Sequence, residues 1–351
     1  MEQSLMVKHY ASFDLHSDNA VLVIIDDTKK FVFKRKFKNE LEPILEALSK
    51  FRKTLCGVVV ESTYNWYWLV DGLMANGYKV HLAHTTTVEG KSQKKYTNDY
   101  RDAFHLADLL RKGDLREGYI YPKEDRPLRD LLRKRGMLVQ SRTRHIQSFE
   151  TMVSRSLGIQ MNAGQVKSLT DSELAQLFPD EHLQLAGRSN LSVIATLSHE
   201  IAILGKAILK KGKLKKEFKL LLTVRGIGDI IALAIAFEIG TINRFPSDND
   251  YVSYCRCAPS KWETNNKKKG EGNRKNGNKY LSWAYIEAAN FSKRFCPYAK
   301  AYYQKKLKKV KRTPIAIKAL AGKIARANYH MLKNGVPFDP EKAFGKLRSS
   351  N

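Results

Sequence analysis

The segment HYASFDLHSDNAVLVIIDDTKKFVFKRKFK, residues 9–38, decides the fold of the first part of the chain. It contains three short runs rich in β-branched and aromatic residues, HYASFDL, AVLVIID and KFVFKRKFK, separated by turn residues at 16–19 and 26–28. Runs of this kind, joined by short turns, predict a three-stranded antiparallel meander.

The residues that follow alternate between helical and strand patterns. Helical spacing over 40–53 precedes the apolar strand CGVVVE (56–61), a helical pattern over 66–77 that Gly77 would end, and the strand YKVHLA (78–83). Three strands, helix, strand, helix, strand is the order of the ribonuclease H fold, although other α/β folds begin in the same way. We therefore predict an α/β domain at the start of the chain.

The rest of the chain is predicted to be helical. Between 116 and 215, apolar residues recur at three- and four-residue steps with arginines at two positions of the same seam: Leu128, Leu131, Arg135, Leu138, Arg142, Phe149 and Val153. This spacing predicts a long helix with a coiled-coil-like seam, whose basic residues either touch nucleic acid or form a solvated face. Residues 157–190 give mixed signals and predict only a helical insert or linker.

Positive charge is concentrated in the second part of the chain. The 351 residues carry a formal net charge of +27; residues 1–113 have 17 Lys or Arg against 14 Asp or Glu, and the remainder has 45 against 21. An excess of this size attracts polyanions through Coulombic forces that weaken steeply with salt. Nucleic acid is therefore the expected partner, ahead of an acidic protein or a membrane surface.

Neither the N-terminal segment nor the cysteines indicate export. The start, MEQSLMVKHY, lacks the apolar region of a signal peptide, and no apolar run reaches the roughly 18 residues of a membrane span. Cys255 and Cys257 are separated by one residue and have no partner pair, so a structural zinc site is not predicted. We expect a cytoplasmic, nucleoid-associated protein without a membrane partner.

A Gly-x-Gly turn stands between two apolar helical patterns in FKLLLTVRGIGDIIALAIAFEIG, residues 218–240. It predicts a helix-hairpin-helix in which Gly226 and Gly228 let backbone N–H groups approach a phosphate, although any tight helix–helix turn uses such glycines. A loop rich in Lys, Gly and Asn follows at 267–279. Cations in and beside this loop are expected to contact the nucleic-acid backbone: Lys261, Lys267, Lys268, Lys269, Arg274 and Lys275.

Four carboxylates occupy special points of the first domain. Asp14 lies in the first strand, Glu61 ends the strand CGVVVE, and Asp99 and Asp102 are one turn apart on a helix predicted over YTNDYRDAFHLADLL, residues 96–110. Acids at strand ends gather at the carboxyl edge of a sheet, and a helix across that edge adds two more. Four such carboxylates can hold two Mg²⁺ or Mn²⁺ ions, which stabilise the attacking and leaving oxygens in phosphodiester cleavage.

Each acid taken alone has a structural alternative, because solvated carboxylates are common at strand ends and on helix surfaces. The ordered set of Asp, Glu and Asp-x-x-Asp is what predicts a metal site. His105 and Asp108, further along the same helix, are weaker candidates.

These residues and motifs resemble those of the DEDD-type insertion-sequence transposases, the family that includes the pilin-gene invertases. The likeness extends over nearly the whole chain: SFDL, VVVES and TNDYRDAFHLADLL in the first half, then LTVRGIGDIIALAIAFEIGTINRF, YCRCAPS, KKKGEGNRKNGNKYLSWAYIEAANF and ARANYHMLKNGVPFD. It implies a RuvC-like domain over 1–115, a helical coiled-coil connection over 116–215, and a mostly helical C-terminal transposase domain with the helix-hairpin-helix over 216–345.

The resemblance also implies chemistry and partners. Strand exchange would combine the metal-bound Asp14, Glu61, Asp99 and Asp102 with a serine nucleophile from the C-terminal domain. The family implies assembly as a homodimer or homotetramer, and guidance by a structured noncoding bridge RNA that pairs with target and donor DNA. Part of the positive charge would then serve RNA as well as DNA.

One position departs from the family pattern. Counting along CAPSKWETNNKKKGEGN without gaps puts Thr264 where the family has its serine. Threonine has a hydroxyl and can act as a nucleophile, while its β-methyl group crowds attack and restricts χ1. Ser260 and Ser253 would substitute only in a rearranged loop; an inactive or repurposed copy and catalysis by the acids alone are the other interpretations.

The resemblance therefore favours a DNA transposase or recombinase that cleaves and transfers strands at the ends of an insertion sequence. A site-specific DNA invertase would use the same chemistry for a different task. A non-catalytic nucleic-acid-binding derivative and a junction-resolving nuclease are the alternatives from other classes.

Overall fold

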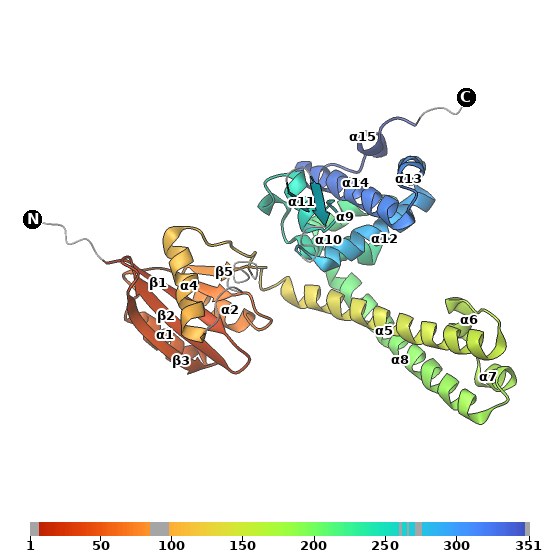
Figure 1. Ribbon diagram of the computed structural model, residues 1–351, viewed down its shortest axis with the longest axis horizontal. Helices are drawn as coiled ribbons and strands as arrows, with labels where there is room; N and C mark the ends of the chain where they lie inside the picture. The colour runs from red at the N-terminus through yellow and green to blue at the C-terminus, as the bar shows by residue number, and fades with distance from the viewer. Residues whose placement is uncertain (1–6, 85–97, 260–261, 265–266, 271–275, 348–351) are drawn as a thin grey trace, which may run out of the picture. The chain divides into compact units, whose positions relative to one another are not determined.

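The computed structural model describes residues 7–84, 98–259, 262–264, 267–270 and 276–347, and only the backbone of 262–264 and 267–270. The chain divides into two compact units, residues 1–123 and 124–351 (Figure 1). The first contains a mixed five-stranded sheet with helices and the second is mostly helical, as predicted. The finer division into three regions stays a prediction.

The first unit is built on a sheet with the strand order β3-β2-β1-β4-β5. β1 pairs antiparallel with β2 and parallel with β4, β2 pairs antiparallel with β3, and β4 pairs parallel with β5. The predicted order of strands and helices over 9–83 is confirmed. The elements are β1 (His9–Leu15), β2 (Asn19–Asp26), β3 (Phe31–Lys38), α1 (Leu41–Ser49), β4 (Leu55–Glu61), α2 (Tyr67–Ala75), β5 (Val80–Ala83) and α4 (Asp99–Lys112).

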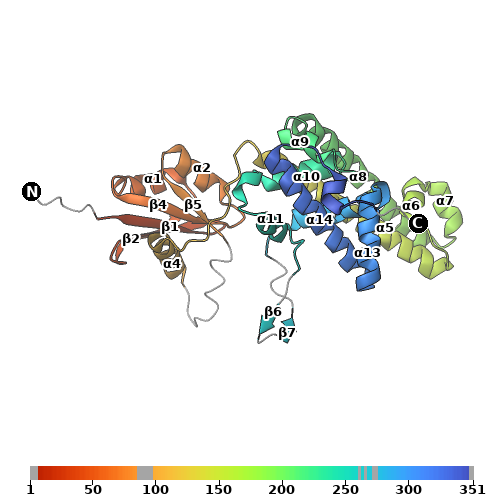
Figure 2. The ribbon, with the colours of Figure 1, turned by 90° about the horizontal axis from the view of Figure 1, so that it is seen from above.

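Helices cover both faces of this sheet (Figure 2). Because side chains alternate along a strand, Ala11, Phe13 and Leu15 point to the face that packs against α1 and α2. The opposite face of β2 packs against Ala103 and Ala107 of α4. The Ser12 hydroxyl donates a hydrogen bond to the backbone carbonyl of Ala103, which fixes α4 along β1.

The two edges of the sheet are protected in different ways. The edge strand β3 exposes a series of cations, Lys34, Arg35, Lys36 and Lys38. At the other edge, the backbone N–H of Gly118 donates to the carbonyl of Leu82 at 2.7 Å, and Ala83 forms an antiparallel bridge with Glu117. The segment after α4 therefore covers the free side of β5.

Two long helices dominate the start of the second unit. α5 (Arg126–Leu157) confirms the long helix predicted there, and α8 (Glu181–Gly212) packs along it. The two helices are antiparallel, because residues earlier on α5 contact residues later on α8. Nδ1 of His145 lies 3.1 Å from Oδ1 of Asn190, and Nη1 of Arg142 lies 3.1 Å from Oγ of Ser198. Arg135 packs beside Gly205.

Two short helices, α6 (Ala163–Ser168) and α7 (Asp171–Leu177), connect the long ones. Each begins with a capping box, in which the side chains of Asn162 and Gln165, or of Thr170 and Glu173, bond to each other's backbone N–H groups. Their apolar side chains form a separate cluster with the ends of α5 and α8, including Phe149, Val153, Val166, Leu174, Phe178 and Ile194.

No uninterrupted apolar run of 18 residues occurs in α8, but this helix is long and apolar on average. An 18-residue window of this helix has a mean hydropathy of 1.4, and 17% of the window is buried. By length and composition alone, this helix could cross a membrane, a test that helices of soluble proteins also pass. α8 packs along α5, and its last turn carries Lys210 and Lys211.

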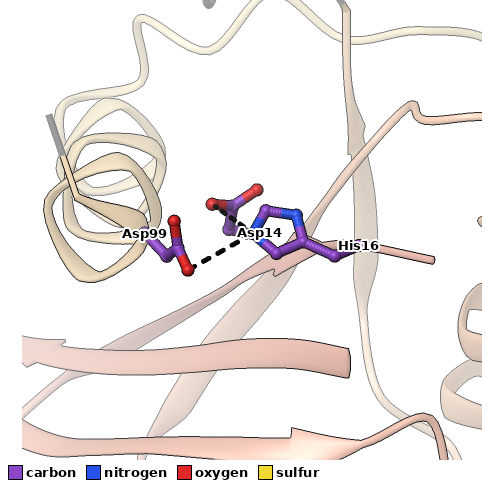
Figure 3. A group of neighbouring side chains, drawn as sticks. All are labelled: Asp14, His16 and Asp99. Carbon is purple, nitrogen blue, oxygen red and sulfur yellow. Dashed lines mark ion pairs between the residues drawn. The ribbon is translucent and has the colours of Figure 1, made fainter. Parts of the chain in front are cut away.

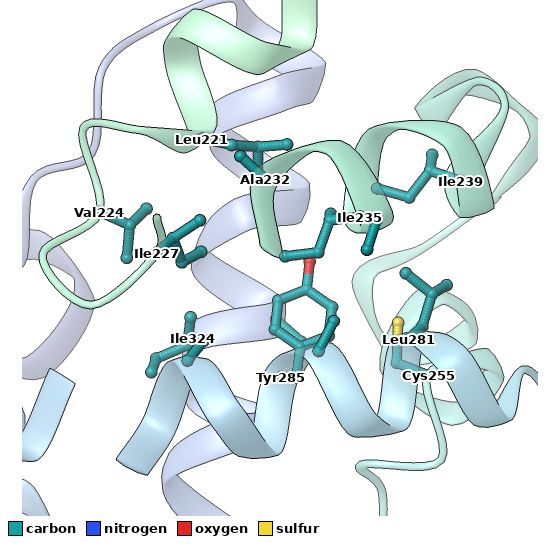
Figure 4. Close-up of a cluster of buried hydrophobic side chains, with 14 of the residues drawn as sticks. Leu221, Val224, Ile227, Ala232, Ile235, Ile239, Cys255, Leu281, Tyr285 and Ile324 are labelled. Atoms are coloured by element: carbon teal, nitrogen blue, oxygen red, sulfur yellow. The ribbon is translucent and has the colours of Figure 1, made fainter. Parts of the chain in front are cut away.

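The remaining helices of the second unit surround one apolar core (Figure 4). α10 lies at its centre, with every side chain from Ala232 to Ile239 buried. The elements are α9 (Lys216–Leu221), α10 (Asp229–Ile239), a 3-10 turn η1 (Ile242–Arg244), α11 (Asp248–Tyr254), β6 (Trp262–Thr264), β7 (Lys267–Gly270), α12 (Lys279–Phe295), α13 (Pro297–Val310), α14 (Thr313–Asn334) and α15 (Pro340–Phe344).

Candidate functional site

Strand alternation puts two of the predicted acids on the same face of the sheet. Asp14 is two residues beyond Ser12 on β1 and therefore shares the face that α4 covers. Glu61 stands two residues beyond Val59, which packs against Leu106 of the same helix. Because β1 and β4 are parallel neighbours, the two carboxylates meet at the carboxyl end of the sheet.

The helix α4 supplies the third acid from its first turn. Asn98 caps this helix by accepting a hydrogen bond from the backbone N–H of Arg101 at 2.9 Å. Asp99 is the first residue after the cap, so its carboxylate lies at the positive end of the helix dipole. The cap and the Ser12–Ala103 bond together place Asp99 over the end of β1.

His16 completes this cluster (Figure 3). Its Nε2 lies 3.4 Å from Oδ2 of Asp99 and 3.9 Å from Oδ2 of Asp14. One ligand atom from each of the three residues lies within 4.8 Å of the others. His16 was not among the predicted ligands, although it stands two residues after Asp14 and directly beyond a buried strand.

The carboxyl group of Asp14 is strongly perturbed. Burial, together with the hydrogen bond to Glu61 and that residue's negative charge, raises the pKa of Asp14 to about 7. Asp14 is only 7% exposed. Two carboxylates this close favour a shared proton, unless a cation takes the place of that proton.

The residues present fit a hard divalent cation. Asp14, Glu61 and Asp99 supply carboxylate oxygens, the donors that Mg²⁺ and Mn²⁺ prefer, and His16 adds one imidazole nitrogen beside them. A bound cation would relieve the electrostatic repulsion between the carboxylates of Asp14 and Glu61.

The other acids and the histidine of α4 differ in their surroundings. Asp102 lies one turn beyond Asp99 and is half-buried; among the described residues, neither Asp102 nor Glu61 is part of the group defined by the 4.8 Å limit, and Glu61 is linked to it through its hydrogen bond with Asp14. His105 is exposed. Burial would raise the pKa of Asp108, but hydrogen bonds from Arg111, Lys29 and Lys112 outweigh it and hold this pKa at about 2. Asp108 is therefore a structural ion-pair centre.

The perturbed Asp14 predicts a pH-dependent stability. Its pKa is raised above the unfolded value of 3.8, so its stabilising contribution is present below pH 4 and is lost as the pH rises through about 7. Without divalent ions, we expect the β1 and β4 amides to lose protection from hydrogen exchange as the pH rises from about 4 to about 7. Asp14→Asn should remove this loss, and Mg²⁺ or Mn²⁺ should reverse it in the unsubstituted protein only.

The exposed Asp18 provides the control, because Asp18→Asn changes the same charge on the same unit. An equal pH response in Asp14→Asn and the unsubstituted protein would contradict the assignment.

The two turn glycines of the predicted helix-hairpin-helix have different roles. Gly226 has a φ of +110°, and a Cβ there would lie 2.4 Å from the backbone N of Ser292 on α12. The Ser292 hydroxyl also donates to the carbonyl of Arg225 at 2.7 Å. Close packing against α12 thus explains why position 226 requires glycine. Gly228, at the start of α10, has open space around it.

Substituting these glycines should separate packing from ligand contact. Gly226→Ala is expected to cost at least about 2 kcal/mol in unfolding free energy, since it combines left-handed strain with a backbone clash. Gly228→Ala should cost about 1 kcal/mol or less, because its φ of −91° suits any residue. If Gly228 approaches a phosphate, Gly228→Ala should lose DNA affinity while its urea unfolding midpoint changes little. Equal destabilisation by Gly226→Ala and Gly228→Ala would contradict the assignment of different roles to the two glycines.

Thr264 ends β6, and its backbone pairs with that of Lys267 on β7. Lys268 and Lys269 follow on β7, and only the backbone of these strands belongs to the described structure; Lys261, Arg274 and Lys275 lie outside it.

Two hydrogen bonds close the base of the loop that contains these strands. The N–H of Asn278 donates to the carbonyl of Tyr254 at 2.6 Å, and Nε of Arg256 donates to the carbonyl of Gly277 at 3.0 Å. The two ends of the loop are therefore held together at α11 and α12.

Two family models match the chain. A model described as "Transposase", of the DEDD type of IS110, matches residues 11–156, and one described as "Transposase IS116/IS110/IS902 family" matches residues 218–304. A curated protein, "Putative transposase y4qE" from Sinorhizobium fredii (strain NBRC 101917 / NGR234), is 24% identical over 226 residues, which are 64% of this chain and 55% of that protein. The chain thus spans about half the length of this relative. The matched stretches contain all four predicted metal ligands and Thr264, and the chain belongs to the IS110 family of transposases.

Proposed function

We propose that this protein is a DNA transposase that carries out metal-dependent cleavage and strand exchange at the ends of an insertion sequence. The observation that carries the proposal is the meeting of Asp14, Glu61 and Asp99 at one end of the sheet. Acids from three separate elements converge on one point of a chain whose other half is strongly basic. Such a centre suits a phosphodiester substrate.

Asp14, Glu61, Asp99 and Asp102 would hold Mg²⁺ or Mn²⁺ in this proposal. When bound, such an ion stabilises negative charge on the attacking and leaving oxygens. His16 would orient the carboxylate of Asp99 through its Nε2, 3.4 Å away. The Ser12–Ala103 hydrogen bond would maintain the separation of Asp14 and Asp99 by fixing α4 on β1.

Thr264 is the proposed nucleophile. A bond would form between its Oγ1 and a DNA phosphorus as one phosphorus–oxygen bond of the strand breaks. The hydroxyl proton would leave Oγ1, and the released DNA oxygen would accept a proton, so that one ester replaces another. The hydrogen bond from Asn278 to Tyr254 closes the base of the loop that contains Thr264.

We further propose a structured noncoding guide RNA as a second partner, assembly as a homodimer or homotetramer, and a cytoplasmic location at the nucleoid. The excess of cations beyond residue 113 supports a polyanionic partner. The helix-hairpin-helix assignment rests on α9, the Gly-x-Gly turn and α10, with Gly228 as its open position.

The test is formation of the excised DNA junction in cells that carry this gene with its native flanks. Junctions lost in Thr264→Ala and Asp102→Ala but kept in Thr264→Ser would support a hydroxyl nucleophile beside the metal acids. Junctions that persist in Thr264→Ala would remove Thr264 from the mechanism. If the native flanks invert a gene segment instead, the protein is an invertase of the same chemistry.

A further inference from the structure

One part of the second unit carries only positive charge. Residues 288–338, which include the last eight residues of α12 and all of α13 and α14, contain thirteen Lys or Arg and no Asp or Glu. Six of these cations are exposed on and just after α13: Lys300, Lys305, Lys308, Lys309, Lys311 and Arg312. None of the six has a carboxylate partner within the described ranges. Neighbouring like charges without counterions raise the free energy of this surface unless a polyanion binds.

Aromatic side chains lie exposed beside this charge. Trp283, Phe291 and Phe295 are separated by eight and four residues on α12, so they share one side of the helix. Their exposed fractions are 38%, 39% and 61%, and none belongs to the core cluster of this unit. Large aromatic rings left in contact with water often mark a binding surface.

The aromatic stripe and the cations lie on two consecutive helices, and their exposed side chains are taken together as one surface. α12 ends at Phe295 and α13 begins at Pro297, and the two helices pack against each other (Figure 1). The ammonium of Lys293 lies 5.2 Å from the ring centre of Tyr303, which joins the last turn of α12 to α13. This surface is hereafter the α12–α13 surface.

We propose that the α12–α13 surface binds unpaired nucleotides of a nucleic-acid strand. The lysines of α13 contact successive phosphates, while Phe291 and Phe295 stack on bases. A duplex offers phosphates but keeps its base faces stacked, so it would leave the aromatic stripe unused. A membrane fits less well, because α13 packs against α14 and, among the described residues, has no exposed large apolar side chain that could enter lipid.

A second copy of this chain is also a poor occupant, because two α12–α13 surfaces facing each other would repel. The inference rests on the proposed function for its partner class. It adds a site distinct from the metal acids, from the two turn glycines and from the lysine loop.

The test is fluorescence anisotropy of the full chain with labelled 20-nucleotide oligo(dT), oligo(U) and a 20-base-pair duplex, in a chelator that prevents cleavage. Replacing both Phe291 and Phe295 by Leu should weaken single-strand binding roughly tenfold per ring and change duplex binding little. Replacing both Lys308 and Lys309 by Ala should lower affinity and reduce the single-strand salt slope by about 1.4.

The control pair is Lys210 and Lys211, since these two lysines also end a helix and are exposed. Replacing them by Ala should leave single-strand affinity within about twofold of the unsubstituted protein. Comparison of oligo(dT) with oligo(U) distinguishes DNA from RNA as the source of the strand.

Single-strand affinity that is unchanged in the Leu variant, or lost equally for single strands and duplex, would overturn the proposal. Thermal unfolding of each variant by circular dichroism shows whether the fold is kept. Because the binding assay needs no cleavage, a failed junction assay with intact strand binding would count against the proposed function alone.

Discussion

Glu61→Gln is expected to lower DNA strand cleavage by at least about 10²-fold, the typical effect of removing one preorganised electrostatic group from an active site. The amide has the size of the carboxylate and lacks its charge, so metal affinity should fall while the sheet stays intact. The negative charge of Glu61 raises the pKa of Asp14, so this substitution should also lower that pKa. Single-turnover cleavage of a labelled DNA end over a Mg²⁺ series measures the loss.

The matched control is Glu42→Gln, which removes an exposed carboxylate from α1 on the opposite face of the sheet. Its cleavage rate should equal that of the unsubstituted protein. A Glu61→Gln variant with normal cleavage at low Mg²⁺ would show that Glu61 holds no metal.

Glu238→Ala is expected to destabilise the second unit by about 3–5 kcal/mol, since removal of one partner leaves other charges buried without compensation. Glu238 is 2% exposed; its carboxylate accepts hydrogen bonds from Arg129 at 3.0 Å, Arg133 at 2.6 Å and Asn278 at 2.7 Å. Arg133 also stacks over the Tyr280 ring, 4.2 Å from its centre. One carboxylate thus joins α5, α10 and the start of α12.

The pH dependence of this contribution has a defined sign. Burial alone would raise the pKa of Glu238, but the hydrogen bond from Arg133 and the charges of both arginines lower it below the ordinary value. Its contribution is therefore present above the unfolded pKa and is lost as the pH falls through the lower folded value.

Urea unfolding at pH 7 measures the loss, and Glu200→Ala, an exposed site on α8, is the control. Equal midpoints for the two variants would contradict the prediction. Because Asn278 caps α12 and closes the loop of Thr264, Glu238→Ala should also reduce junction formation.

The sheet could be predicted from the sequence because its signals are local. Alternation of apolar residues and turn residues determined the strands over 9–83, and the strand ends indicated where Asp14 and Glu61 would meet. The same reasoning missed His16, since its contact with Asp99 depends on how α4 crosses the sheet. Residues 157–190 also carried usable signals: the pairs Asn162/Gln165 and Thr170/Glu173 are capping boxes that mark helix starts.

Ion pairs between residues far apart in the chain could not be predicted from the sequence. Glu238 is a single acid in an otherwise apolar helix, and its partners Arg129 and Arg133 lie more than 100 residues earlier on α5. The ion-pair centre at Asp108 was similarly hidden, because Lys29 reaches it from the turn between β2 and β3. Such pairings depend on tertiary packing, which no local pattern reports.

The cations on β3 have a consequence for how copies of this protein meet. An edge strand has unpaired backbone N–H and C=O groups that can pair with a strand of another molecule, and such intermolecular pairing leads to aggregation. Lys34, Arg35, Lys36 and Lys38 would face the same four charges on a second β3. Electrostatic repulsion therefore opposes pairing of two β3 strands and prevents intermolecular sheet formation in concentrated protein.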